Sequence, residues 1–170
     1  MTRDQRVVAL GAGSGAIAMV ASVTAIYRFW PVDPGLTDIS ARIACTLRAD
    51  AFAILPLLFS VMAVGNNRFL SEAIDPTLQK EDRATLINGR VADNTQQQYL
   101  LFLVGTLTLS TRLTVDQMRV IPAAAIVFVV ARILFWIGYR IDPLYRAFGF
   151  SSTAYLNLGL LLGSLWFWLA

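Results

Sequence analysis

The sequence predicts an all-α integral membrane protein with five membrane-spanning helices. Of its 170 residues, 56% are hydrophobic and only 15% are charged, and the mean hydropathy is +0.60. A soluble domain of this size needs more charge to cover its surface. The apolar residues also fall into runs close to the ~20 residues that a helix needs to cross the hydrocarbon core of a bilayer. Helices that face lipid explain this balance better than one soluble core.

The first apolar run, Val7–Ile26, has no charged residue and predicts a spanning helix. It contains the segment Gly11-Ala-Gly-Ser-Gly15, which superficially resembles a glycine-rich phosphate loop. No strand precedes this segment, and Gly11 and Gly15 have the small-xxx-small spacing of helix packing in membranes. We therefore expect the two glycines to pack against another helix.

The second span requires two neighbouring segments. Leu36–Thr46 predicts a short helix at the membrane surface, and the apolar run Ala51–Gly65 reaches spanning length when it is extended back to Ile43. Pro56 predicts a kink in this span. The polar stretch Asn66–Arg83 is typical of an exposed loop.

Three further helices complete the predicted bundle. The third runs from about Leu86 to Thr111, and its first half is unusually polar. The fourth runs from about Val120 to Tyr139 and encloses Arg132. The fifth, Ala147–Ala170, carries no charge.

The basic residues predict the orientation of these spans. Eight Lys and Arg residues lie on the side that carries the N-terminus, and five lie on the other side. The positive-inside rule therefore places the N-terminus in the cytoplasm and the C-terminus outside or in a lumen. A net charge of +3 can also indicate nucleic-acid binding, but these charges lie in short gaps between apolar runs. We therefore expect membrane lipids, and no nucleic acid, as partners.

The residue types that are absent limit the possible chemistry. The chain has one cysteine, Cys45, and no histidine. One cysteine excludes an intrachain disulfide and a cysteine-cluster metal site, and we expect no metal. The absence of histidine removes the usual general base. Any chemistry must rest on Arg, Tyr, Asn, Gln, acids or a thiol supplied by a ligand.

Two polar stripes carry the candidate site. The third helix presents one stripe at positions i, i+4, i+7 and i+8, a spacing that puts side chains on one helix face. The fourth helix presents a second stripe in which Arg132 is the deepest cation and has no acidic partner in its own helix. An amide of the third helix, or another subunit, is its simplest partner. The first stripe is Arg90, Asn94, Gln97 and Gln98; the second is Arg132, Phe135, Trp136, Tyr139 and Arg140.

Converging arginines, amides and a tyrosine suit a carboxylate-bearing ligand, because the guanidinium group makes bidentate contacts with carboxylates. Arginine also stabilises a thiolate by lowering the pKa of the thiol. The alternative interpretation is that these polar groups only hold the helices of an oligomer together.

These motifs resemble the MAPEG family, the membrane-associated proteins in eicosanoid and glutathione metabolism. Members share an Arg-xxx-Asn-xx-Glu pattern, which stands here as Arg90, Asn94 and Gln97. Members also share an Ala-Arg…Tyr stretch and a following Arg, which matches Ala131-Arg132…Tyr139 and then Arg146. The resemblance covers roughly residues 45–170. The Arg-Ala-Phe-Gly-Phe segment and the extra first helix are most similar to the branch that contains mattrin and bacterial relatives.

The resemblance implies a domain organisation and an assembly. Residues 43–170 would form a four-helix MAPEG-like membrane domain, and residues 1–42 would add an N-terminal transmembrane helix and its connecting loop. The family implies a homotrimer that binds glutathione between subunits at the cytoplasmic side. The bacterial relatives imply a location in a bacterial inner membrane.

The resemblance also assigns roles to residues. Arg146 would be the catalytic residue that activates the thiol of glutathione. Gln97 departs from the family pattern, because a neutral amide binds the ligand's ammonium group less well than a glutamate does. The implied glutathione-binding residues are Arg90, Asn94, Gln97, Gln98, Arg132, Tyr139 and Arg140.

Two functions follow as hypotheses. The first is a membrane glutathione-dependent transferase or peroxidase that acts on lipophilic electrophiles or lipid hydroperoxides. The second is a non-catalytic protein of the same fold that binds a lipid or a protein partner. A channel or transporter is poorly supported, because the helices show no obvious inverted repeat.

Overall fold

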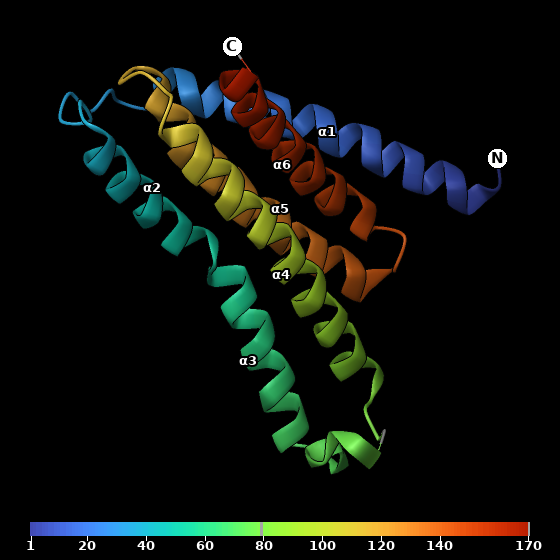
Figure 1. Ribbon diagram of the computed structural model, residues 1–170. Helices are drawn as coiled ribbons and strands as arrows, with labels where there is room; N and C mark the ends of the chain where they lie inside the picture. The colour runs from blue at the N-terminus through green and yellow to red at the C-terminus, as the bar shows by residue number, and fades with distance from the viewer. Residues whose placement is uncertain (79, 170) are drawn as a thin grey trace.

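A computed structural model describes residues 1–78 and 80–169, and within these residues the only regular structure is helical. Three short 3₁₀ turns accompany six α-helices (Figure 1). The α-helices are α1 (Arg3–Phe29), α2 (Ile39–Ala53), α3 (Leu55–Phe69), α4 (Arg83–Ser110), α5 (Val120–Ile141) and α6 (Arg146–Leu169). The 3₁₀ turns are η1 (Glu72–Ile74), η2 (Pro76–Leu78) and η3 (Gln117–Arg119). The all-α class predicted from the sequence is confirmed.

The second predicted span differs from the expectation at its start. α2 begins at Ile39, where the Asp38 carboxylate accepts a hydrogen bond from the Ala41 N–H at 2.9 Å, and it continues to Ala53. The separate surface helix expected over 36–46 is therefore wrong, because its residues form the first part of one long span. The kink expected at Pro56 is confirmed: α2 ends and α3 begins around Ile54, two residues before a proline that has no N–H to donate.

Three helical segments are long and apolar enough to cross a membrane by length and composition: Arg3–Phe29, Ile39–Phe69 and Gln117–Ile141. The remaining two, α4 and α6, have 28 and 24 residues and also exceed the ~20 residues that a span needs. Both carry Ser, Thr, Asn or Gln side chains that are buried against other helices. Five helical segments of spanning length are therefore present.

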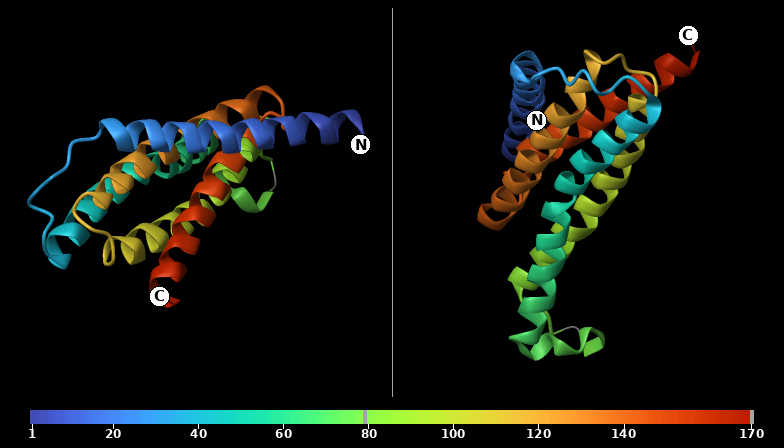
Figure 2. Two further views of the ribbon diagram at one scale, coloured as in Figure 1. Left: turned by 90° about the horizontal axis from the view of Figure 1, so that it is seen from above. Right: turned by 90° about the vertical axis from the view of Figure 1, so that its left-hand side faces the viewer.

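The helices form one bundle, with the extra N-terminal helix on its outside. α1 packs on α6 and α5, while α4 packs on α3, α6, α2 and α5. The α3–α4 pair, with its connecting 3₁₀ turns, projects beyond the ends of α5 and α6 (Figures 1 and 2). We call the end of the bundle at which α1, α4 and α6 begin, and α3 and α5 end, the inner end.

The glycines of α1 face α6, as the sequence predicts. A side chain at Gly15 would overlap the Phe148 carbonyl and the Ser151 hydroxyl, so only glycine permits this approach. The Ser151 and Ser152 hydroxyls each donate a 2.9 Å hydrogen bond to a backbone carbonyl of α1. The interpretation of Gly11 and Gly15 as a packing face is confirmed.

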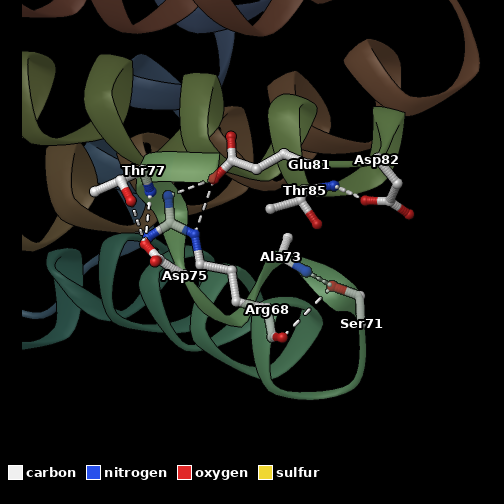
Figure 3. A network of polar contacts seen from close by, with 8 residues as sticks. All are labelled: Arg68, Ser71, Ala73, Asp75, Thr77, Glu81, Asp82 and Thr85. Atoms are coloured by element: carbon white, nitrogen blue, oxygen red, sulfur yellow. Dashed lines mark hydrogen bonds and ion pairs between the residues drawn. The ribbon is translucent and has the colours of Figure 1, made fainter. Parts of the chain in front are cut away.

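The connection between α3 and α4 is more structured than the predicted loop over 66–83. α3 continues to Phe69, and the Arg68 guanidinium donates to Glu81 at 2.9 Å, which closes the connection (Figure 3). The Asp82 carboxylate then caps α4 by accepting from the Thr85 N–H at 2.8 Å. These contacts fix where α4 starts, and α4 carries the first polar stripe.

Candidate functional site

A layer of paired polar side chains crosses the bundle, centred on Arg132. Arg132 lies in the middle of α5 and is only 1% exposed. Its guanidinium donates to the Asn94 side-chain oxygen at 3.0 Å, to the Thr95 hydroxyl at 2.9 Å and to the Thr153 hydroxyl at 3.3 Å. It also stacks 4.0 Å from the ring centroid of Phe135. The predicted amide partner from the third spanning helix is confirmed, and Arg132 joins α4, α5 and α6.

The layer extends along α4, away from the inner end. The Asn157 amide of α6 donates to both the side-chain and the backbone oxygen of Gln98 at 2.9 Å. About two turns further along α4, the Asp50 carboxylate of α2 accepts from the Thr106 hydroxyl at 3.0 Å. Asp50 is 1% exposed, so α2 also brings a buried polar group to α4. These pairs satisfy polar groups that would otherwise face lipid.

A cavity of about 580 Å³ lies at the inner end, beside this layer. It brings together the cationic and polar residues Arg90, Asn94, Tyr139 and Arg146, which come from α4, α5 and α6. The Arg146 guanidinium lies 4.8 Å from the ring centroid of Tyr139. Its apolar walls include Val8 and Ala12 of α1, Phe135 of α5, and Phe150 and Ala154 of α6.

The cations of the cavity lie towards the inner end, and the lining beyond them is mostly apolar. Along α6, Tyr155 lies nine residues beyond Arg146, which corresponds to ~13 Å of helix, and Ser151 lies between them. Along α5, Phe135 lies one turn deeper than Tyr139. Within the described residues, the guanidinium groups of Arg90 and Arg146 have no hydrogen-bond or ion-pair partner. The rim therefore offers two cations to a ligand, and the deeper lining offers mainly apolar side chains together with Asn94, Ser151 and Tyr155.

The remaining predicted site residues lie elsewhere. Gln98 is turned towards Asn157 and is 7% exposed, whereas Gln97 points out of the bundle. Of the four residues of the first stripe, Arg90 and Asn94 line the cavity, whereas Gln97 and Gln98 do not. Gln98 lies eight positions beyond Arg90, which corresponds to a rotation of about 80° around the helix, so it faces Asn157 of α6. Arg140 is exposed and does not line the cavity, and Arg132 lies behind Asn94 rather than in the wall.

A second cavity, of about 500 Å³, lies between α3 and α4 and shares Arg90 with the first. Its lining combines the Arg68–Glu81 pair with Asp93, so it presents both cations and carboxylates. Of the described residues that line the first cavity, none is acidic. A carboxylate that could accept an ammonium group is therefore available next to Arg90, but not in the wall that carries Arg146.

Several lining residues were not identified from the sequence. Val8 and Ala12 belong to α1, and Ser151 and Tyr155 belong to the uncharged fifth span. The positions of Gly11 and Gly15 could have identified Val8 and Ala12, because all four residues lie on the same face of the helix. The sequence did not indicate which helix this face would meet.

Comparisons with known proteins agree with this architecture. The sequence model described as "MAPEG family" matches residues 43–166. Transmembrane protein 79 of Mus musculus is 26% identical over 167 residues, which cover 91% of this chain and 42% of the relative. Transmembrane protein 79 of Bos taurus is 26% identical over 156 residues, which cover 91% of this chain and 39% of the relative. No solved structure matches the chain.

The chain spans about two fifths of the length of these curated relatives. Because their match leaves out only 9% of the chain, it includes part of α1, which the family match omits. The relatives agree with the mattrin-like part of the resemblance. Both are mammalian and give no support to the bacterial part, so a bacterial inner membrane stays a prediction.

Proposed function

The chain belongs to the MAPEG family of integral membrane proteins, and on that premise we propose that it is a glutathione-dependent transferase or peroxidase. Its substrates would be lipophilic electrophiles or lipid hydroperoxides that enter from the bilayer. The observation that carries this proposal is the convergence of Arg90, Asn94, Tyr139 and Arg146 on one cavity at the inner end of the bundle.

The side chains of this cavity fit the acidic parts of glutathione. Arg90 and Asn94 lie one turn apart on α4 and suit a carboxylate, because guanidinium and amide N–H groups both donate to its oxygens. The ammonium group has no acidic partner among the described residues of this wall. Asp93 and Glu81, in the adjacent cavity that also contains Arg90, are the nearest candidates for that role.

Arg146 is the residue best placed to activate the thiol. It lies at the start of α6 on the polar rim, and a nearby cation lowers the pKa of a thiol by favouring the thiolate. Tyr139 contacts Arg146 and places a hydroxyl donor on the same rim. In conjugation, the glutathione thiol loses its proton to solvent, and the thiolate sulfur bonds to an electrophilic carbon as the carbon–halogen bond breaks and halide leaves. In peroxide reduction, two equivalents of glutathione convert a hydroperoxide to an alcohol and water with formation of the disulfide.

The assembly and orientation are part of the same proposal. We place the N-terminus and the cavity on the cytoplasmic side, because the basic residues are more numerous there. We also propose the homotrimer that the family implies, with itself and membrane lipids as partners. The division of the chain into residues 1–42 and 43–170 likewise stays a prediction.

A non-catalytic role is the second candidate, and one observation favours it. The family's glutamate is replaced by Gln97, and none of the described residues that line the cavity is acidic, so neither supplies an acid for glutathione's ammonium group. Under this alternative the cavity would hold a lipid with an anionic head, or the bundle would bind a protein partner, and no thiol chemistry would occur.

Activity of the purified protein decides between the two. We expect glutathione-dependent conjugation of a lipophilic aryl halide, or reduction of a lipid hydroperoxide, that falls by about 100-fold in Arg146→Gln because a charge-stabilising donor is lost. Arg83→Gln is the matched control, since Arg83 is an exposed arginine at the inner end that lies outside the cavity. Equal activity in the two variants would contradict the role of Arg146, and no activity in any form would favour the non-catalytic alternative.

A further inference from the structure

The helix that the family match omits forms one wall of the cavity. Val8 and Ala12 lie one turn apart on α1, and both face the space lined by Phe150 and Ala154 of α6. The polar rim, in contrast, is built only from α4, α5 and α6. α1 therefore adds to the cavity a wall that the residues of the family match do not supply.

The wall is held in a fixed position. Near Ala12, the Ser151 hydroxyl donates to the Ala12 carbonyl at 2.9 Å, and Gly15 allows the two backbones to approach closely. At the other end of α1, the Tyr27 hydroxyl donates to Asp116 at 3.2 Å, and the Arg119 guanidinium lies 4.5 Å from the Tyr27 ring centroid. Since α1 is anchored along its length, a larger side chain at position 12 must occupy the cavity rather than displace the helix.

The small residues of this wall lie deep in the cavity. Ala12 is four residues further along α1 than Val8, which corresponds to ~6 Å. Its carbonyl accepts the Ser151 hydroxyl, three residues before Ala154 on α6, and Ala12 and Ala154 both line the cavity. These two residues contribute only methyl groups to the lining, whereas the cations Arg90 and Arg146 lie nearer the inner end.

We propose that α1 is the selectivity wall of the cavity and that Ala12 limits the length of hydrocarbon that can lie behind an anionic head group held by Arg90 and Arg146. The ligand class is an amphiphile with a carboxylate head and an unbranched chain. The identity of the head group, glutathione, rests on the proposed function. The limit on the hydrocarbon chain rests on the geometry of α1 and α6.

The test uses a chain-length series on the full protein in lipid nanodiscs. Binding of glutathione and its S-ethyl, S-hexyl and S-decyl derivatives is measured by calorimetry, with empty nanodiscs to correct for partitioning. The wild type should bind the longer derivatives more tightly, because each buried methylene contributes ~0.8 kcal/mol, or ~4-fold in affinity. In Ala12→Leu this gain should stop after S-ethyl, while affinity for glutathione itself changes less than about 2-fold. In Val8→Ala, which widens the same wall, affinity for S-decylglutathione should rise relative to S-ethylglutathione, and an unchanged ratio would count against the wall.

Ala21→Leu is the matched control. Ala21 lies on the exposed face of α1, so this substitution adds the same side chain outside the cavity. Identical chain-length profiles in Ala12→Leu, Ala21→Leu and the wild type would overturn the proposal. Helix content and thermal midpoint are recorded for each variant, and Val8→Ala tests the wall by enlarging it if Ala12→Leu does not fold.

A second series separates this inference from the proposed function. Hexanoate, decanoate and tetradecanoate carry the carboxylate and the chain without glutathione. Binding of these acids that depends on length and on Ala12, without binding of glutathione, would support the wall and contradict the proposed function. If glutathione binds, but the dependence of affinity on S-alkyl chain length is the same in Ala12→Leu as in the wild type, the proposed function would be supported and the wall contradicted. If neither series bound, both proposals would be wrong.

Discussion

Two polar regions lie side by side in this bundle, and they differ in how their polar groups are satisfied. In the layer around Arg132, each polar side chain named above has a partner on another helix at 2.9–3.3 Å, and of these side chains only Asn157 keeps a buried oxygen without a partner among the described residues. At the cavity rim, Arg90 and Arg146 are exposed and have no hydrogen-bond or ion-pair partner within residues 1–78 and 80–169. The two regions meet at Asn94, which binds Arg132 and also lines the cavity.

The difference shows how to assign roles to polar residues within a membrane helix. A polar group that faces lipid without a partner is costly, so a paired group is explained by folding alone. An arginine at the mouth of an open cavity has no such structural explanation and is the better candidate for contact with a ligand. The layer therefore accounts for the fold, and the rim accounts for the proposed chemistry.

Removal of Arg132 should give the largest effect on stability. Arg132→Ala leaves a cavity in a fully buried position and takes the donors away from Asn94, Thr95 and Thr153. We expect a loss of about 3 kcal/mol or more in the free energy of unfolding, measured by thermal or denaturant unfolding in detergent. Arg140→Ala, at an exposed position on the same helix, should change it by less than about 0.5 kcal/mol. Equal stability of Arg132→Ala and Arg140→Ala would contradict the structural role of Arg132 in the layer.

The next largest effect should follow from separating α5 and α6, which hold the layer together. A Cβ at Gly149 would overlap the backbone of Ala131 and Phe135, whereas a Cβ at Gly159 meets no atom within 4 Å. We therefore expect Gly149→Ala to lower stability by about 2–3 kcal/mol because of overpacking. Gly159→Ala should be neutral or stabilising, since alanine favours helix. A large loss in Gly159→Ala would show that this face of α6 is covered in the assembled protein.

Asn94 provides a sharper comparison, because it belongs to both regions. Asn94→Ala should lower stability by about 1 kcal/mol through the lost bond to Arg132 and should also weaken glutathione binding. Arg90→Gln should weaken binding by about 10-fold and leave the thermal midpoint unchanged, because Arg90 contributes only to the rim. Calorimetry and thermal unfolding on the same samples separate the two effects. A purely structural Asn94 would lower the midpoint without changing the affinity.

The smallest effect should occur in the connection between α3 and α4. Glu81→Gln removes an ion pair with Arg68, and the side chains of these residues are 20% and 36% exposed. A partly exposed pair of this kind contributes at most about 1 kcal/mol, and less at high salt. We expect the difference in thermal midpoint between wild type and Glu81→Gln to shrink as salt is added. A difference that is insensitive to salt would mean that Glu81 acts through packing instead.

The sequence predicted the helices better than it predicted their faces. The apolar runs located α1, α4, α5 and α6 within a few residues, because the hydrophobic span has a fixed length. The break near Pro56 was also predictable, since proline has one consistent effect on a helix. The surface helix over 36–46 was not distinguished from a longer span, because a capped helix start and a separate helix have similar patterns.

The site was predictable only in part. Arg90, Asn94, Tyr139 and Arg146 meet as the motifs indicate, because their spacing puts them at the same end of three helices. Gln97, Gln98 and Arg140 do not join them, since neighbouring positions on a helix point in different directions. The contribution of Val8 and Ala12 depends on which helix α1 packs against, and a single sequence does not give tertiary contacts.

The central claim is that the cationic rim binds glutathione as a thiolate. We would test it by titrating glutathione into the detergent-purified protein at neutral pH and following the ultraviolet difference absorbance of the thiolate, in the wild type and in Arg146→Gln. We expect a saturable signal in the wild type that is lost in Arg146→Gln, while a fold assay gives the same result for both. No thiolate signal in the wild type, together with no binding in an independent assay, would show that the rim does not bind glutathione and would favour a lipid as the ligand of the cavity.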